Sequence, residues 1–421
     1  MFRLISPDSG NYRIHLGEKR NMKKQILALT AMLAIAGLSS CGPATEKMKV
    51  GLLTLHGTES TYDKNFIDAF NAACEAKGVE PLLQSGIGED ATCTAAANKM
   101  VQEGAKLIFA DSFGHETHLH EAAKDAKDVE FCHATGVHAA EYEAAGEKNF
   151  HNAFASIYEG RYLAGVAAGL KLQAMLAANP STSKKVGYVG AYTYAEVVSG
   201  LTSWYLGVKS IVSDVTMDVR FTGDWYNIEK ENSSATALIN GGCSIISQHA
   251  DSMGAPNACE AAGVPNITYN GPTAKETYVI SSKINWQPYF EHCIDAVKAG
   301  KPIETNYTGS LKDGSVEIGE IGPAAAEGTK AKIDEVKAAL EAGTTKVFDT
   351  STFTLNTANA ALEEGKKLDL DADGHIKSYS VNGTNVIKSE GSKSWFAESE
   401  IQSAPYFDLT IDGITFLNTE F

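Results

Sequence analysis

The sequence lacks the motifs that usually mark a catalytic or nucleotide-binding centre. Its 421 residues contain no Gly-x-Ser-x-Gly elbow, no Walker loop and no His-Glu-x-x-His helix. A basic surplus is also missing, because 36 Lys and Arg stand against 52 Asp and Glu, for a net charge of -16. A protein that follows nucleic-acid phosphates needs a basic surface, so nucleic acid is excluded as a partner. These absences favour binding over catalysis, and we expect neither cofactor nor metal.

Long apolar runs are scarce, and the one near the start is short. It opens at Lys23 and Lys24 and continues from Ile26 to Leu38, which is typical of a secretory signal. Roughly 13 apolar residues are too few for a membrane-spanning helix, which needs ~20. The closing Leu-Ser-Ser-Cys41 resembles the lipobox of bacterial lipoproteins, which implies that Cys41 becomes the lipidated N-terminus. An ordinary cleaved signal that happens to contain a cysteine is the alternative.

Residues 1–41 are therefore predicted to be a signal peptide preceded by a mis-chosen start, since residues 1–21 come before Met22. We expect an exported protein, anchored by lipid at the cell surface or on the periplasmic face. Six further cysteines permit 15 pairings, between which a sequence cannot choose. Most lie in apolar patterns, so buried free thiols are expected, with a Cys74–Cys93 bridge as the alternative; the six are Cys74, Cys93, Cys132, Cys243, Cys259 and Cys293.

From Met48 onward, short β-rich runs alternate with helical patterns that end at glycine, which predicts repeated βαβ units around parallel sheets. Residues 47–156 form a first lobe, beginning with a strand over 49–55 and a helix over 64–77 with Gly78 as its C-cap. Residues 157–285 form a second lobe, opened by a helix over 159–177 whose Gly165 and Gly169 indicate close contact with a neighbour. Residues 286–345 are predicted to return to the first lobe, and that crossing makes a hinge. Residues 346–421 carry turn signals between short alternating runs and are predicted to form a small β-rich appendage.

Aromatic, amide and carboxylate side chains follow the predicted strands. In open α/β sheets ligands bind beyond the carboxyl ends of the strands, so these residues are the candidates for a binding site. Flat aromatic faces beside carboxylates and amides suit a planar heterocycle, which stacks on the rings and is selected by hydrogen bonds to its edge. The alternative is that Tyr62, Trp225 and Trp286 only pack the seam between the lobes. The candidates are Tyr62, Asp63, Asn65, Phe66, Ser112, Phe113, Trp225, Asp251, Asn270, Asn285 and Trp286.

Several segments resemble a known family. They are the segments 158–165, Tyr-Glu-Gly-Arg-Tyr-Leu-Ala-Gly, and 185–190, Lys-Val-Gly-Tyr-Val-Gly, then Glu196-Val197, and Gln-His-Ala-Asp-Ser over 248–252 with Ala255-Pro256. In this order they resemble the basic membrane protein family, the substrate-binding lipoproteins of ABC importers related to purine nucleoside receptors. The resemblance covers about 47–344, while the tail matches only a narrower branch.

The resemblance implies an α/β, type I periplasmic-binding-protein fold, with two doubly wound lobes that grip a purine-like ligand. Tyr62 and Trp225 would stack the base, and the rim would hold Asp63, Asn65, Ser112, Phe113 and Asp251. The nucleoside-binding branch has an aspartate at the position that aligns with Asn270 and a lysine at the position that aligns with Asn285. In that branch these two charged residues would hold the ribose. Since both charges are missing here, a free nucleobase such as adenine is favoured over a nucleoside. The implied partners are the ligand and the ABC permease subunits in the membrane, and the protein is expected to be a monomer.

Three other functions remain as alternatives. A nucleoside hydrolase or another α/β enzyme would need an acid or base at the cleft, for which Asp111 and His249 are the candidates. A metal-solute receptor would use the cluster His115, His118 and His120, which lacks cysteine or carboxylate partners at zinc spacing. A sensor or adhesin would bind a surface partner through the β-rich tail.

Overall fold

The computed structural model describes residues 46–355 and 365–421. Cys41 and the whole predicted signal peptide lie outside these residues. Within them, no helix combines the length and the apolar character that crossing a membrane requires.

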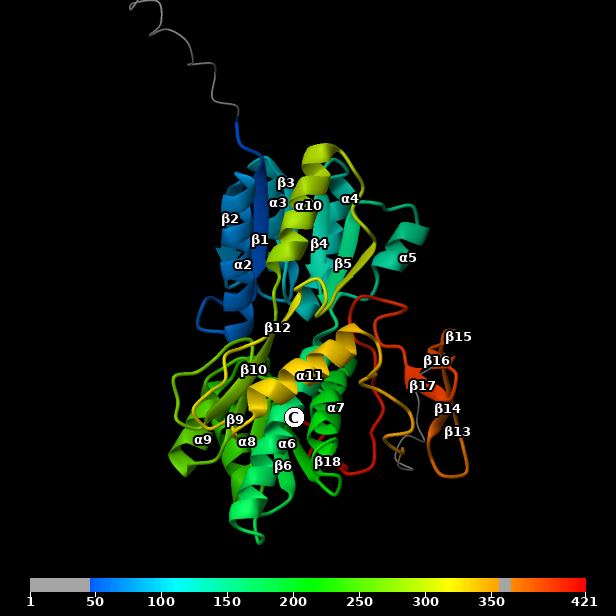
Figure 1. The fold of residues 1–421 in the computed structure, drawn as a ribbon. Helices are drawn as coiled ribbons and strands as arrows, with labels where there is room; N and C mark the ends of the chain where they lie inside the picture. The colour runs from blue at the N-terminus through cyan, green and yellow to red at the C-terminus, as the bar shows by residue number, and fades with distance from the viewer. Residues whose placement is uncertain (1–45, 356–364) are drawn as a thin grey trace, which may run out of the picture. The chain divides into compact units, whose positions relative to one another are not determined.

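The first lobe is built on a parallel six-stranded sheet in the order β11-β5-β4-β3-β1-β2 (Figure 1). Its strands are β1 (Lys49–Thr54), β2 (Glu80–Ser85), β3 (Ala105–Ala110), β4 (Glu130–Ala134), β5 (Phe150–Ala155) and β11 (Asn306–Gly309). The helices that accompany it are α2 (Thr61–Lys77), α3 (Ala91–Gln102), α4 (Glu116–Asp125), α5 (Ala139–Ala144) and α10 (Gln287–Ala299), with the short 3-10 turn η1 (Phe113–His115) before α4. As predicted, Gly78 ends α2 in the left-handed conformation, with φ 63°.

The second lobe has a seven-stranded sheet in the order β12-β10-β9-β8-β6-β7-β18, in which only the β10–β12 pair is antiparallel. Its strands are β6 (Lys185–Gly190), β7 (Thr216–Phe221), β8 (Ile246–Gln248), β9 (Asn266–Tyr269), β10 (Tyr278–Ile284), β12 (Val316–Ile318) and β18 (Ile414–Phe416). Its helices are α6 (Ile157–Ala178), α7 (Ala195–Lys209), α8 (Ile228–Asn240), α9 (Gly254–Ala262) and α11 (Thr329–Glu341). The expected α/β fold with two doubly wound lobes is confirmed.

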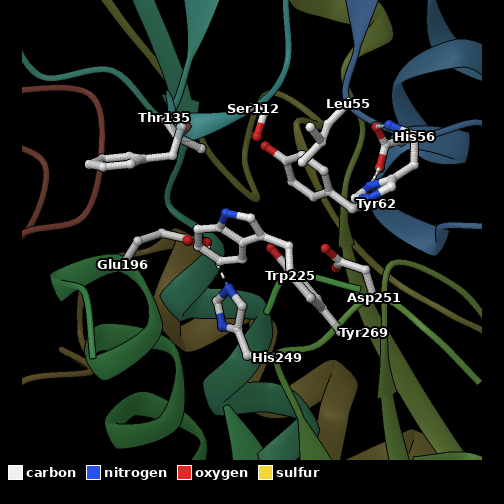
Figure 2. Close-up of a pocket in the computed structure, with 12 residues that line it drawn as sticks. Leu55, His56, Tyr62, Ser112, Thr135, Glu196, Trp225, His249, Asp251 and Tyr269 are labelled. Atoms are coloured by element: carbon white, nitrogen blue, oxygen red, sulfur yellow. Dashed lines mark hydrogen bonds and ion pairs between the residues drawn. The ribbon is translucent and has the colours of Figure 1, made fainter. Parts of the chain in front are cut away.

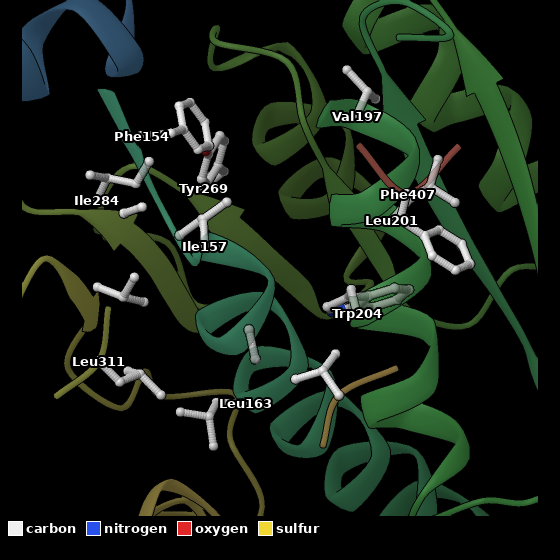
Figure 3. Packing of buried hydrophobic residues seen from close by; sticks show 14 of the residues in the cluster. Phe154, Ile157, Leu163, Val197, Leu201, Trp204, Tyr269, Ile284, Leu311 and Phe407 are labelled. Carbon is white, nitrogen blue, oxygen red and sulfur yellow. The ribbon is translucent and has the colours of Figure 1, made fainter. Parts of the chain in front are cut away.

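Helices α6 and α7 pack closely through glycine. A Cβ atom on Gly165 would lie 2.1 Å from the carbonyl oxygen of Trp204, and one on Gly207 would lie 2.2 Å from that of Tyr162. The contact predicted from Gly165 and Gly169 is therefore present, with α7 as the neighbour. Val197, Leu201 and Trp204 lie along α7 in the buried core of this lobe (Figure 3).

The return to the first lobe is shorter than predicted. The chain crosses after β10, and α10 packs on α2 while β11 joins the first sheet. It then goes back, because β12 pairs with β10 and α11 packs on α6. Residues from 316 to 341 thus belong to elements of the second lobe, and the chain passes between the lobes after β5, after β10 and after β11.

The tail is more closely integrated than the predicted appendage. It does contain two small antiparallel sheets, formed by β13 (Lys366–Leu370), β14 (Ile376–Val381) and β15 (Thr384–Asn385), and by β16 (Ile387–Glu390) and β17 (Lys393–Phe396). Its last strand, however, is the edge strand of the second lobe, where β18 pairs with β7 in parallel. Phe407 is fully buried and stacks on Phe348, with ring centroids 4.5 Å apart. The tail is therefore part of the second lobe's core.

Candidate functional site

A pocket lies where the carboxyl ends of strands from both sheets meet (Figure 2). The residues that line it lie at or beyond the carboxyl ends of parallel strands: Leu55, His56, Tyr62, Asp63, Ser112, Phe113 and Thr135 from the first lobe, and Glu196, Trp225, His249, Asp251 and Tyr269 from the second. This is the position at which open α/β sheets bind ligands. The cavity measures about 30 Å³, room for about two water molecules. A larger guest enters only if the walls separate.

The pocket has aromatic walls from both lobes. Trp225 from the loop after β7 lies among the labelled side chains of Figure 2, and Tyr62 from the first turn of α2 lies on the other lobe's side. The Tyr62 hydroxyl donates a hydrogen bond of 2.9 Å to the carbonyl oxygen of Asp111, which fixes the ring. At the rim, Phe113 of the first lobe stacks on Tyr194 of the second, with ring centroids 5.0 Å apart.

The first lobe contributes a charged pair, His56 and Asp63. The backbone N–H of His56 donates to Asp63 over 2.7 Å, and the imidazole Nδ1 lies 3.4 Å from the other carboxylate oxygen. This pairing raises the pKa of His56. Burial would raise the pKa of Asp63, but hydrogen bonds from His56 and Ser60 outweigh burial, and its pKa lies below the usual value. Asp63 is therefore a carboxylate already satisfied by its own loop.

Asp251 is the carboxyl group that the second lobe presents to the pocket. The residue is 5% exposed, and within residues 46–355 and 365–421 no group donates a hydrogen bond to its side chain. Burial raises the pKa of Asp251 well above its usual value, and the charges of Asp63, Glu231 and Glu196 raise it further, while Arg161 lowers it. A buried carboxyl group without a protein donor is suited to accept a hydrogen bond from a ligand.

A second buried layer supports the pocket floor. His249 lies 2.8 Å from Glu196 through Nε2, as the dashed line in Figure 2 shows, and burial lowers the pKa of His249 despite that carboxylate. Arg161 is fully buried on α6, donates to the carbonyl of Gln248 over 3.0 Å, and lies 3.5 Å from the centroid of the Tyr269 ring. A buried guanidinium over an aromatic face is attracted to the ring, so Arg161 helps to hold Tyr269 in place at the pocket.

Several pocket residues were absent from the candidates for ligand binding. Glu196 and His249 belong to the segments that resemble the family, and both come after a strand. That position is the signal that could have identified them as pocket residues. Leu55, His56 and Tyr269 likewise flank strand ends. Thr135 has φ 68°, a conformation that β-branched residues rarely adopt, and it follows β4 at the pocket wall. Only three-dimensional coordinates reveal that strained backbone.

The structure places five of the predicted candidates elsewhere. Phe66 and Trp286 are each 2% exposed and stack on one another in the first lobe's core, with centroids 4.3 Å apart. Asn65, Asn270 and Asn285 line a separate, open cavity of about 800 Å³ beside the pocket. The Asn285 amide donates to the carbonyl of Gly314 and to Glu317. The remaining six, Tyr62, Asp63, Ser112, Phe113, Trp225 and Asp251, are brought together around one cavity.

The histidine cluster takes structural roles. His115 is buried and lies 2.9 Å from the carbonyl oxygen of Ile87, while His120 is paired with Glu147. Among the residues that the structure describes, no three His, Cys, Asp or Glu side chains are placed to hold a metal ion. The six cysteines after Cys41 are buried and free, and the sulfurs of Cys132 and Cys293 lie 3.9 Å apart.

The two residues considered as the acid or base of an enzyme, Asp111 and His249, also have partners within the protein. Asp111 is fully buried, accepts a hydrogen bond from the Leu55 backbone over 3.2 Å, and has a pKa raised well above its usual value by burial and by Asp63. His249 is held by Glu196.

Two sheet-based lobes that enclose a pocket of aromatic rings and carboxyl groups between them are typical of the class of two-lobed solute-binding proteins. The family model for "ABC transporter substrate-binding protein PnrA-like" matches residues 58–345. The chain belongs to this family, as the sequence resemblance implied. Its members are extracytoplasmic substrate-binding proteins of ABC transporters and not enzymes.

Three relatives have names that indicate ligands. A purine-binding protein of Brucella abortus is 31% identical over 289 residues, covering 67% of this chain and 77% of the relative. A putative ABC transporter glucose-binding protein of Haloferax volcanii is 29% identical over 235 residues, 55% of this chain and 56% of the relative. An ABC transporter nucleoside-binding protein of Lactococcus lactis is 25% identical over 340 residues, 71% of this chain and 92% of the relative.

Solved structures agree on the fold. A solute-binding protein of Aeropyrum pernix aligns with a TM-score of 0.60 at 15% identity, covering 72% of this chain and 93% of that structure. Identity at this level shows the periplasmic-binding-protein fold alone.

Proposed function

We propose that this protein captures a purine between its two lobes and delivers it to the permease of an ABC importer. The observation that carries the proposal is the pocket in which Tyr62 and Trp225 face one cavity from opposite lobes, with Asp251 unpaired at its edge. Aromatic faces stack on any purine ring, and a buried acceptor selects a ring with an exocyclic amine. The relative named for purine binding, at 31% identity, supports the same ligand class.

A free nucleobase fits the site better than a nucleoside. The ribose partners that the nucleoside-binding branch would use correspond to Asn270 and Asn285, which line the neighbouring cavity and carry no charge. Thr61 lines that neighbouring cavity and Asp251 lines the pocket. The backbone N–H of Thr61 donates a hydrogen bond of 2.9 Å to the carbonyl oxygen of Asp251. The contact between Thr61 and Asp251 thus lies at the boundary between the two lining sets, and neither asparagine is among the residues that line the pocket.

Lobe closure supplies the mechanism. A ligand that touches both lobes in the closed form stabilises that form by its differential affinity. A cavity of about 30 Å³ is smaller than a purine, so binding requires the lobes or the pocket side chains to move apart first. The permease then recognises the loaded protein by the shape that closure creates.

Anchoring is a separate part of the proposal and depends on Cys41, which lies outside the described residues. Lipid on Cys41 would keep the receptor beside its permease. Replacement by Cys41→Ser in cells fed a labelled fatty acid tests this, because the variant should lose the label. A labelled variant would exclude Cys41 as the attachment point.

The ligand itself is tested by mass spectrometry. Protein purified without added ligand is denatured, and small molecules released from it are identified beside a matched sample of the Trp225→Ala variant. We expect a purine base from the first sample and much less from the second. A hexose or a nucleoside released in stoichiometric amount would overturn the preference for a base.

A further inference from the structure

Residues 417–421 of the tail run alongside β7 to the carboxyl end of that strand. After β18, which pairs with β7 in parallel, the backbone N–H of Leu417 donates to the carbonyl oxygen of Val219 over 2.9 Å. The Asn418 side chain then pairs with Phe221 in both directions. It accepts from the backbone N–H at 3.0 Å and donates to the carbonyl oxygen at 2.9 Å. The tail therefore reaches the loop after β7, which places Trp225 at the pocket.

The ring of Phe421 packs against the first turn of this loop. Gly223 has φ 72°, and a Cβ atom added to it would lie 2.5 Å from the Cδ2 atom of the Phe421 ring. A side chain at this position would therefore be strained in its backbone and would also displace the ring. Phe421 is 58% exposed, so its contact with the loop adds little to the buried core of the lobe.

Phe421 also belongs to a group of aromatic rings that extends to the other lobe. Its ring meets Tyr192 edge to face, with centroids 5.6 Å apart. Tyr192 in turn meets Trp225 edge to face and stacks on Tyr194, in both cases with centroids 5.0 Å apart. Tyr194 stacks on Phe113 of the first lobe. The tail is thus connected, ring by ring, both to the tryptophan of the pocket and to the contact between the lobes.

We propose that Phe421 is a positioning residue for ligand binding, which holds the Gly223 turn and the Tyr192 ring and so sets the orientation of Trp225 in the pocket. Aromatic pairs prefer a limited set of ring angles, so the place of the Tyr192 ring restricts that of the indole beside it. The inference rests on the proposed function, because it concerns the ring on which the purine stacks. It gives the tail a part in ligand binding beyond completing the edge of the sheet.

Calorimetric titration with adenine measures the effect on binding. Phe421→Ala removes one edge-to-face pair, so the Kd should rise by roughly two- to tenfold. Phe421→Tyr keeps the ring and should bind as the parent does. The matched control is Leu417→Ala, which shortens a side chain on the same segment that is 47% exposed and outside the group of rings, and it should leave the Kd unchanged. Because all three substitutions are at exposed positions, the unfolding temperature should stay within about 2 °C of the parent value.

A second measurement follows the indole without any ligand. The chain has four tryptophans, so protein labelled with 5-fluorotryptophan gives one fluorine resonance for each, and Trp225→Phe identifies the resonance of Trp225. Phe421→Ala should shift that resonance and leave the other three in place, since those rings lie outside the group. Phe421→Tyr should restore the parent position. A purely structural role of the tail end would not single out one of the four resonances.

Two results would overturn the inference. One is an unchanged Trp225 resonance in Phe421→Ala, and the other is a loss of adenine affinity in Leu417→Ala as large as that in Phe421→Ala. Either would leave the tail end with a structural role alone. If the parent does not bind adenine while Phe421→Ala still shifts the Trp225 resonance, purine capture is wrong and the positioning role of Phe421 is supported.

Discussion

The backbone N–H of Thr61 donates a 2.9 Å hydrogen bond to the carbonyl oxygen of Asp251, and so ties the start of α2 in one lobe to the loop after β8 in the other. The same loop carries the carboxyl group that faces the pocket. Contact between the lobes therefore also fixes the loop that places the Asp251 side chain at the pocket. Phe113 and Tyr194 add a second contact across the seam at the rim.

Removal of the central ring should weaken purine binding. Trp225→Ala deletes a stacked face worth about 1–3 kcal/mol, which corresponds to roughly a 5- to 150-fold rise in Kd. Isothermal titration with adenine measures the change. Trp395→Ala is the matched control, since it removes a half-buried tryptophan of β17 that does not line the pocket, and it should leave adenine affinity unchanged.

The carboxyl group of Asp251 should select for an exocyclic amine. Asp251→Ala removes the carboxyl oxygen that would accept from the amine, so adenine binding should weaken by about tenfold or more. Hypoxanthine, which has a carbonyl in place of the amine, should lose much less or gain. Equal effects on both bases would assign Asp251 to the scaffold and remove it from ligand recognition.

The rim stack should contribute to closure. Phe113→Ala and Tyr194→Ala each remove one ring of a pair that spans the lobes, and a double-mutant cycle on adenine affinity isolates the contact. We expect a coupling of about 0.5–1.5 kcal/mol, expressed mainly as faster ligand release in stopped-flow measurements. Additive effects of the two substitutions would show that the rings do not act together in the bound form.

Glu398 should make stability fall as the solution becomes alkaline. Burial raises the pKa of Glu398 to about 8, from 4.5 for an ordinary glutamate, although the backbone N–H groups of Phe407 and Tyr406 lower it. The folded protein therefore holds this proton more tightly than the unfolded chain, so the stabilisation is full below pH 4.5 and is lost as the pH rises toward 8. Urea unfolding between pH 5 and pH 8.5 should show this loss in the parent and a flatter profile in Glu398→Gln. Parallel profiles would mean that the carboxyl group is already ionised in the folded protein.

The sequence was sufficient to predict the elements with strong periodicity. Strand β1, helix α2 with Gly78 as its cap, and the close contact of α6 marked by Gly165 all lie where the pattern placed them. No strand was predicted over β5, because its buried positions include the polar residues His151 and Asn152 and so do not form an apolar pattern. His151 is paired with Glu130. The Asn152 side chain donates to Glu116 and accepts from the backbone N–H of Ala139. A single sequence does not reveal such internal partners.

Position after a strand explains which of the candidate residues meet at the pocket. Tyr62, Ser112, Trp225 and Asp251 lie at the pocket for that reason. Trp286 also follows a strand, but it begins α10 and turns its ring into the core beside Phe66. The direction of a side chain at a helix start depends on packing between elements distant in sequence, as does the choice of β7 as the partner of β18. Neither is encoded in a local pattern.

The most direct test of purine capture is calorimetric titration of ligand-stripped protein with adenine, adenosine and glucose under the same conditions. The account predicts saturable binding of adenine with one site per chain, weaker binding of adenosine and none of glucose. Tighter binding of glucose or adenosine than of adenine would contradict it.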